Sequence, residues 1–170
     1  MALAKFIRLS SRVGSTINRR KVIRGYFEVH RIAKLQIGAG PNTIEGWLNT
    51  DLFPRKNGVV FLDARKPFCF DNDSFDYVFS EHQIEQLTYA DGLMMLAECF
   101  RVLKPGGRIR IATTSMDALI SLTLSPQSHP QREYIKWITE HYLYHIETYE
   151  PAFVINNAFN TYGAIIIAAA

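Results

Sequence analysis

Two glycines and an acid between residues 34 and 52 have the types and spacing to do chemistry. Gly38 and Gly40 follow a short apolar run, and because glycine has no Cβ, a ligand can approach the backbone closely there. Asp51 ends the next apolar run, where its carboxylate can accept hydrogen bonds from both hydroxyls of a ribose. The sequence therefore predicts a site for a cofactor that contains a nucleoside.

Short apolar runs predict the strands that must position these residues. The expected strands cover residues 35–37, 47–50, 59–63, 75–80 and 108–113. Too few residues separate Gly40 from Trp47 for a crossover helix, so we expect a turn there. Strands that alternate with helices predict an α/β fold with a doubly wound, mostly parallel sheet.

One helix is expected between the last two strands. Residues 88–91 have the form of a capping box, and the helix should continue to Leu103. The sequence 104–107, Lys-Pro-Gly-Gly, should end the helix and reverse the chain. Apolar positions spaced for one face of the helix should pack on the sheet, namely Leu93, Leu96, Ala97 and Phe100.

Charge divides the chain into two parts. Residues 1–34 contain nine Lys or Arg and one acid, Glu28, although the whole chain has 19 basic and 16 acidic residues. We expect residues 1–33 to form a basic helical arm, with the firmest helical pattern over 20–31, and residues 34–170 to form the main domain. The arm is either a solvated surface helix or a site for nucleic acid, an anionic surface or an acidic partner.

Cysteine usage and hydropathy bear on where the protein works. Cys69 and Cys99 are too few and too isolated for a disulfide framework or a metal cluster, and they suit a reducing cytoplasm. We therefore expect a cytoplasmic protein without a metal site. No run of about 18 apolar residues is present, so no transmembrane helix is expected, and the sequence does not predict the oligomeric state.

The kind of cofactor can be narrowed from the same motif. A dinucleotide fingerprint needs a third glycine and an acid about 20 residues further on. Here Thr43 occupies the third glycine position, and Asp51 comes only 13 positions after Gly38. The match to a nicotinamide dinucleotide is poor, and the Gly-Lys-Ser/Thr of a phosphate-binding loop is absent from the sequence.

Four blocks of sequence, in this order, resemble class I S-adenosylmethionine-dependent methyltransferases, particularly the small type 11-like group. The blocks are residues 37–40, 47–51, 75–82 and 103–108, and the resemblance extends over roughly half of the chain. It implies a Rossmann-like sheet with S-adenosylmethionine as cofactor. The family fold usually ends in a sixth and a seventh strand, and too little sequence follows Gly163 for both, so we expect a sheet truncated at its C-terminal strands.

The resemblance also implies which residues bind the cofactor. Gly38 and Gly40 would pass under its methionine part, and Asp51 would hold the ribose hydroxyls. Asp63 would accept from the adenine amine, and Ser80 would face the methionine part. The full set expected to bind S-adenosylmethionine is Gly38, Ala39, Gly40, Asp51, Leu52, Asp63, Ala64, Ser80 and Glu81. One departure concerns Gln36, which stands where many members of the family have an acid that orders the cofactor's amino group.

The expected reaction is methyl transfer to a small-molecule or saccharide-type acceptor, with most of the rate coming from alignment of the two reactants. A general base is needed only if the acceptor must lose a proton. His82 is the candidate base by position, with Glu81 or Glu85 behind it; alternatively His82 only caps the next helix. An alternative function is a cofactor-binding or partner-binding domain with little or no catalytic activity.

Overall fold

The computed structural model of the chain describes residues 19–124, 126–143 and 148–159. These residues fall into two compact units, Met1–Thr113 and Thr114–Ala170. The first unit contains the sheet and all the residues that the sequence assigns to the cofactor site. Expectations for residues 1–18 lie outside the described residues, and the division of the chain at residue 34 stays a prediction.

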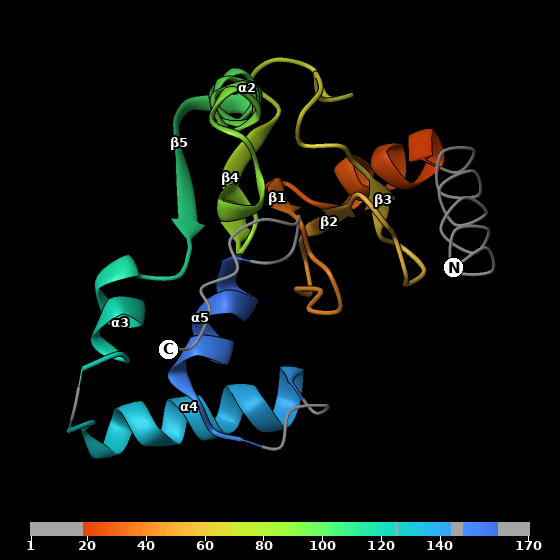
Figure 1. Cartoon of the computed structure of the whole chain (residues 1–170). Coiled ribbons are helices and arrows are strands. Elements are labelled where there is room, and N and C mark those ends of the chain that lie inside the picture. The colour runs from red at the N-terminus through yellow and green to blue at the C-terminus, as the bar shows by residue number, and fades with distance from the viewer. Residues whose placement is uncertain (1–18, 125, 144–147, 160–170) are drawn as a thin grey trace, which may run out of the picture. The chain divides into compact units, whose positions relative to one another are not determined.

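The first unit is built on one five-stranded sheet in the order β3-β2-β1-β4-β5 (Figure 1). All four pairs of neighbouring strands are parallel, which confirms the expected sheet. The strands are β1 (Lys34–Ile37), β2 (Leu48–Asp51), β3 (Val60–Phe61), β4 (Phe75–Glu81) and β5 (Leu103–Ala112). Because the chain crosses from β1 outward in both directions, the carboxyl ends of β1 and β4 form the switch point where such sheets bind ligands.

The connections differ from the expected ones in two places. No helix lies between β1 and β2, as expected, and only turns and bends occupy residues 38–47. β3 is reduced to two residues, so Leu62 and Asp63 belong to the following loop. Residues 104–107 are part of β5: Phe75 pairs with Leu103 and Tyr77 with Arg108, so the Lys-Pro-Gly-Gly sequence forms a bulge in the ladder instead of a separate turn.

Helix α2 (Tyr89–Val102) begins as expected but packs with a different face. The Thr88 side chain accepts from the Asp91 N–H at 3.2 Å, which is the predicted N-cap. The predicted buried face is wrong, since Leu93, Leu96 and Phe100 are exposed. The helix leads directly into β5, and this connection turns Val102 toward the sheet. The residues one and two turns before Val102 lie on the same side of the helix and therefore face the sheet as well. The buried apolar face is therefore Gly92, Met95, Cys99 and Val102.

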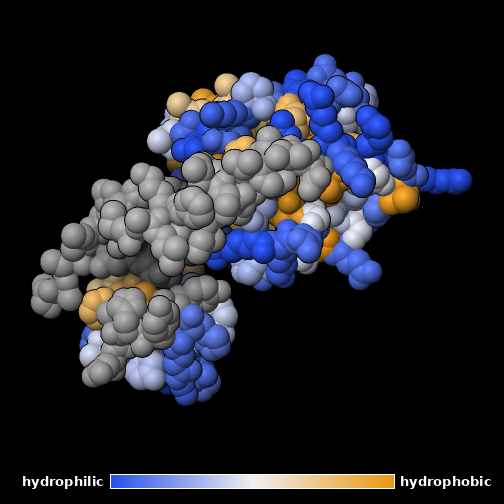
Figure 2. All heavy atoms as spheres, turned by 90° about the vertical axis from the view of Figure 1, so that its right-hand side faces the viewer, coloured by the Kyte–Doolittle hydropathy of each residue, from blue (hydrophilic) through white to orange (hydrophobic). Residues whose placement is uncertain are grey.

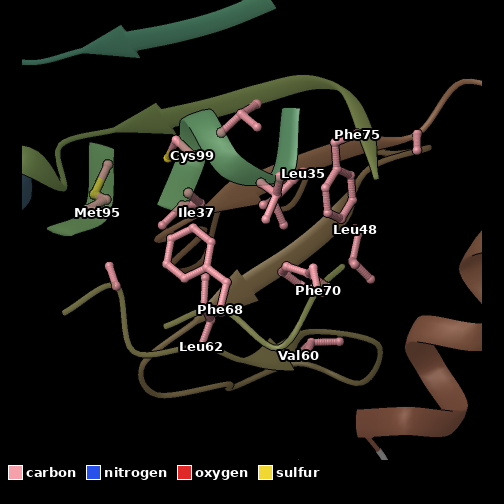
Figure 3. Packing of buried hydrophobic residues seen from close by; sticks show 14 of the residues in the cluster. Leu35, Ile37, Leu48, Val60, Leu62, Phe68, Phe70, Phe75, Met95 and Cys99 are labelled. Atoms are coloured by element: carbon pink, nitrogen blue, oxygen red, sulfur yellow. The ribbon is translucent and has the colours of Figure 1, made fainter. Parts of the chain in front are cut away.

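Side chains from one face of the sheet form the core of this unit (Figure 3). Leu35, Leu48 and Val78 are register partners on adjacent strands and are at most 2% exposed. Met95 and Cys99 of α2 pack on the same core, and both are fully buried. Burial raises the pKa of Cys99 to about 12, so this thiol stays protonated and behaves as an apolar side chain.

A helical segment over the described residues 19–29 is attached to this core by Tyr26. The Tyr26 hydroxyl accepts from the Lys34 N–H at 2.7 Å and donates to the Lys34 carbonyl oxygen at 3.0 Å, and the ring stacks on His30. Val22 and Ile23 pack against the same core. The helix predicted over 20–31 is thus confirmed over most of its length, and it is anchored to the sheet that follows it.

A buried ion pair fixes the long loop between β3 and β4. Glu98 on α2 is only 9% exposed, and its carboxylate accepts from the Phe68 N–H at 2.5 Å and from the Arg101 guanidinium at 2.7 and 2.9 Å. Arg101 in turn donates to the carbonyl oxygens of Phe68 and Phe70. Two charged side chains one turn apart on α2 therefore hold the backbone of this loop in place.

Acid is expected to destabilise the first unit through these pairs. The hydrogen bond from Arg101 lowers the pKa of Glu98, and the hydrogen bond from Lys104 lowers the pKa of Asp76. A carboxyl whose pKa is lower in the folded state stabilises the fold above its unfolded pKa and loses that contribution as the pH falls through the folded value. Urea unfolding should thus give a free energy of unfolding that is level near neutral pH and falls below about pH 4. A free energy that is unchanged down to about pH 3 would contradict this.

The described residues of the second unit form three helices, α3 (Met116–Ser121), α4 (His129–Tyr142) and α5 (Pro151–Phe159). α4 starts with a capping box in which the side chains of Ser128 and Gln131 each bond the other's backbone N–H. The core of the second unit is a separate apolar cluster that includes Leu119, Ile135 and Val154. Among the described residues of this unit no strand occurs, and no described helix of the chain is long and apolar enough to cross a bilayer.

Candidate functional site

The glycine turn after β1 has a backbone that favours glycine. Gly38 and Gly40 have φ values of +70° and +52°, in the left-handed region that other residues rarely adopt. A Cβ built on Gly38 would lie 2.3 Å from Oε1 of Gln83, so the Gln83 side chain occupies the space that the missing Cβ leaves. The space beside Gly40 is open, with nothing within 4 Å. The turn therefore presents bare backbone at Gly40, whereas the Gln83 side chain lies over Gly38.

Asp51 fixes the position of this turn. Its Oδ2 accepts from the Gly40 N–H at 2.8 Å, and its Oδ1 accepts from the Phe53 N–H at 2.6 Å. The Ala39 N–H bonds the Thr50 carbonyl at 2.9 Å, so the turn is tied to the end of β2 twice. Each carboxylate oxygen can accept more than one hydrogen bond, so Asp51 can hold the turn and still accept from a ligand.

Two buried polar atoms near the turn have no hydrogen-bond partner among the described residues: Oε1 of Gln36 and Oγ of Ser80. Gln36 is 4% exposed, and its amide nitrogen donates to the Asn42 carbonyl at 2.9 Å, so the unpaired oxygen lies beside the glycine turn. Ser80 is fully buried next to Ile37 on the neighbouring strand. An unpaired buried acceptor costs about 1–3 kcal/mol, which a bound donor could recover.

At the end of β4 the chain changes direction at His82. This residue has a φ of +51°, which is unusual for a residue other than glycine. Its N–H donates to the Ala112 carbonyl oxygen at 3.0 Å. Its Nδ1 lies 2.8 Å from Oε1 of Glu85, which belongs to the short helix η1 (Ile84–Gln86). Glu81 is the last residue of β4 and is exposed. Of the two acids proposed to stand behind His82, the structure pairs Glu85 with it.

Asp63 and Ala64, the residues expected near adenine, lie just after the short β3. The Arg65 side chain donates two hydrogen bonds of 2.8 and 2.9 Å to the Asp63 carboxylate. This contact is the main reason why the pKa of Asp63 is lowered. Asp63 is therefore ionised near neutral pH and acts as an acceptor only. Ala64 is buried in the core, and Leu52 is half-buried directly after Asp51.

The structure brings together the carboxyl ends of β1, β2 and β4 with Gly38, Asp51 and Ser80, as the sequence predicts for the center of the site. Sequence reasoning missed Gln83, because its place over Gly38 depends on the left-handed turn at His82, which no local pattern indicates. Two open grooves, of about 380 and 580 Å³, lie elsewhere in this unit. One is lined by residues within 43–59 and the other by residues within 72–107, and neither lining includes Gly38, Asp51 or His82.

Comparison with known proteins finds a family that matches part of the chain. Residues 47–111 match the family described as the methyltransferase domain, which is less than half of the chain and includes three of the four motif blocks. The match confirms the resemblance to S-adenosylmethionine-dependent methyltransferases for this stretch, and the parallel sheet in the order 3-2-1-4-5 is the Rossmann-like fold expected with it. S-adenosylmethionine is the cofactor that this family implies. No curated protein is significantly similar to the chain.

Several solved structures are similar in fold. A methyltransferase from Archaeoglobus fulgidus is 25% identical, with 76% of this chain and 66% of that chain covered and a TM-score of 0.44. A protein from Methanococcus maripaludis described as a putative methyltransferase is 15% identical, with 66% of this chain and 60% of that chain covered and a TM-score of 0.42. The methyltransferase CalH in complex with SAH is 18% identical, with 47% of this chain and 31% of that chain covered and a TM-score of 0.37. The chain thus spans less than two thirds of the length of the last two proteins.

Proposed function

We propose that this chain binds S-adenosylmethionine at the carboxyl edge of its sheet and transfers the methyl group to a small-molecule or saccharide-type acceptor. The observation that carries the proposal is the unpaired, buried Oε1 of Gln36 beside a glycine turn that Asp51 holds in place. This acceptor suits the amino group of the methionine part, and the backbone at Gly40 is open for the rest of it. The family of residues 47–111 supports the same cofactor.

The site residues divide the work as follows in this proposal. Gly38, Ala39 and Gly40 lie under the methionine part, with Ser80 and Glu81 beside it. Asp51 and Leu52 hold the ribose, and Asp63 and Ala64 hold the adenine. When bound, the cofactor supplies an already activated methyl group on a sulfonium. The protein contributes alignment and exclusion of water, which is where most of the rate of such a displacement can come from.

His82 and Glu81 are the proposed catalytic residues. If the acceptor is a hydroxyl, the imidazole of His82 takes its proton as the methyl group moves. Glu85 supports this role, since its contact with Nδ1 at 2.8 Å orients the ring. Its carboxylate would also stabilise the imidazolium that forms. We place the reaction in the cytoplasm, because both cysteines are free thiols, Cys69 exposed and Cys99 buried.

Calorimetry of the full chain with S-adenosylmethionine, S-adenosylhomocysteine and NAD tests the cofactor assignment. The first two should bind and NAD should not. Binding of NAD alone would overturn the proposal, and so would the absence of binding by all three.

Substitutions of Gln36 test directly whether its unpaired Oε1 binds the cofactor. Replacement by leucine removes the acceptor for the ligand and also the amide that donates to the Asn42 carbonyl, so the Kd for S-adenosylmethionine should rise by at least about tenfold. Gln36→Glu loses the same bond to Asn42 but keeps an acceptor oxygen and adds a charge opposite to that of an amino group, so its Kd should be lower than that of the leucine variant. Equal affinity of the leucine variant and the wild type would remove Gln36 from the site.

A further inference from the structure

The helical segment 19–29 and the turn that follows it, 30–32, form an outward-facing basic surface on the first unit. The inward side of the helix is occupied, because Val22, Ile23 and the 8%-exposed Tyr26 pack on the core. The segment is therefore a rigidly held part of the unit, and its remaining side faces solvent. Figure 2 views the molecule from the side on which this segment lies in Figure 1.

Four cations are exposed on this surface: Arg20, Lys21, Arg24 and Arg31. None of them forms an ion pair with any residue that the structure describes, and Glu28 is the one acid within 19–32. Some basic side chains elsewhere in this unit are paired with acids, for example Arg65 with Asp63 and Lys104 with Asp76. The segment thus concentrates positive charge that the fold itself does not use.

Large aliphatic side chains are exposed in the same segment. Val29 is 73% exposed and Ile32 is 56% exposed, and Arg31 lies between them in the sequence. Phe27 is 37% exposed, with its ring against Phe75 at a centroid distance of 5.3 Å. A short segment that exposes both cations and aliphatic groups is typical of surfaces that enter the headgroup region of a bilayer.

We propose that segment 19–32 docks the protein on an anionic lipid bilayer, with Arg20, Lys21, Arg24 and Arg31 against the lipid phosphates and with Val29 and Ile32 in the headgroup region. Each cation near an anionic leaflet contributes to binding, and four of them on one segment act together. Docking would hold the methyltransferase unit at the membrane surface without a spanning helix.

A bilayer fits these side chains better than a nucleic acid does. Phosphate contacts alone would suit either one, since both are polyanions. Single-stranded nucleic acids also need aromatic faces on which bases stack, and the segment offers aliphatic groups instead, while Tyr26 is buried against His30 and Phe27 lies against Phe75. Val29 and Ile32 have a role at a bilayer and none in stacking.

Vesicle co-sedimentation of the full chain tests this proposal. Vesicles of phosphatidylcholine with phosphatidylglycerol should bind the protein, and vesicles of phosphatidylcholine alone should not. Arg20→Gln with Arg24→Gln should weaken binding on the order of 25-fold, at about fivefold for each charge. Val29→Ser with Ile32→Ser should weaken it on the order of tenfold.

Two control variants separate this surface from net charge. Arg55→Gln with Arg108→Gln changes the net charge equally at exposed positions elsewhere in the unit, and it should leave binding within about twofold. Arg20→Lys with Arg24→Lys keeps the charge and should do the same. Circular dichroism of each variant confirms its fold. Three results would overturn the proposal: no binding to anionic vesicles, equal losses in the Arg55/Arg108 control, or full binding by the Val29/Ile32 variant. Tighter binding of a short single-stranded RNA than of the vesicles, lost in the same variants, would assign the surface to nucleic acid instead.

Discussion

Replacing Asp51 with alanine is expected to raise the Kd for S-adenosylmethionine by at least about tenfold. Two effects act in the same direction. The proposed hydrogen bonds from the ribose are lost, and the Gly40 and Phe53 N–H groups lose their acceptor, at about 1–3 kcal/mol each. The glycine turn that should lie under the cofactor is then no longer held against β2. Calorimetry of the variant beside the wild type measures the change.

Asp51→Asn and Asp71→Ala complete this test. Asparagine keeps one acceptor oxygen, so its affinity should fall between those of the wild type and the alanine variant. Asp71 is an exposed acid in the loop before β4, and its replacement should leave the Kd unchanged within about twofold. If Asp51→Ala binds as tightly as the wild type while its fold is intact, Asp51 does not belong to the cofactor site.

Replacing Glu98 with alanine is expected to lower the free energy of unfolding by about 3 kcal/mol or more. The substitution removes an acceptor from the Phe68 N–H and leaves the Arg101 guanidinium, whose side chain is 30% exposed, without its carboxylate. Breaking a largely buried pair from one side costs more than the pair contributes, because the remaining charge is poorly solvated. Urea unfolding followed by circular dichroism measures the loss.

Glu133→Ala is the matched control for Glu98→Ala, because Glu133 is an exposed glutamate on α4. It should change the free energy of unfolding by no more than about 0.5 kcal/mol. The double variant Glu98→Met with Arg101→Met removes both charges and should be less destabilised than Glu98→Ala alone. Equal stability of Glu98→Ala and Glu133→Ala would mean that the ion pair does not hold the loop between β3 and β4.

Local patterns were sufficient for much of the sheet. Apolar runs predicted β1 and β4 to within a residue at each end, and the Thr88 cap set the start of α2. The rotation of α2 could not be predicted in this way, because the helix has two apolar stripes with the same spacing. The direct connection from Val102 into β5 decides which stripe is buried, and that connection is a property of the assembled sheet. The same pairing turns the Lys-Pro-Gly-Gly sequence into a bulge.

For the candidate site, the sequence indicated which residues meet but not what they do there. Gly38 and Asp51 come together because parallel strands end at one edge. That Asp51 also binds the backbone of the glycine turn depends on how residues 38–47 fold without a helix. Gln83 reaches Gly38 only because His82 adopts a left-handed conformation, and Glu85 pairs with His82 for the same reason. Such contacts depend on three-dimensional turns that spacing along the chain does not reveal.

A crystal structure of the chain with S-adenosylhomocysteine tests the central claim most directly. We predict density for the ligand over the turn at Gly38 and Gly40, with the ribose hydroxyls within hydrogen-bond distance of the Asp51 carboxylate and the amino group next to Oε1 of Gln36. Ligand density in either of the grooves lined by residues 43–59 or 72–107, with the glycine turn empty, would contradict the account.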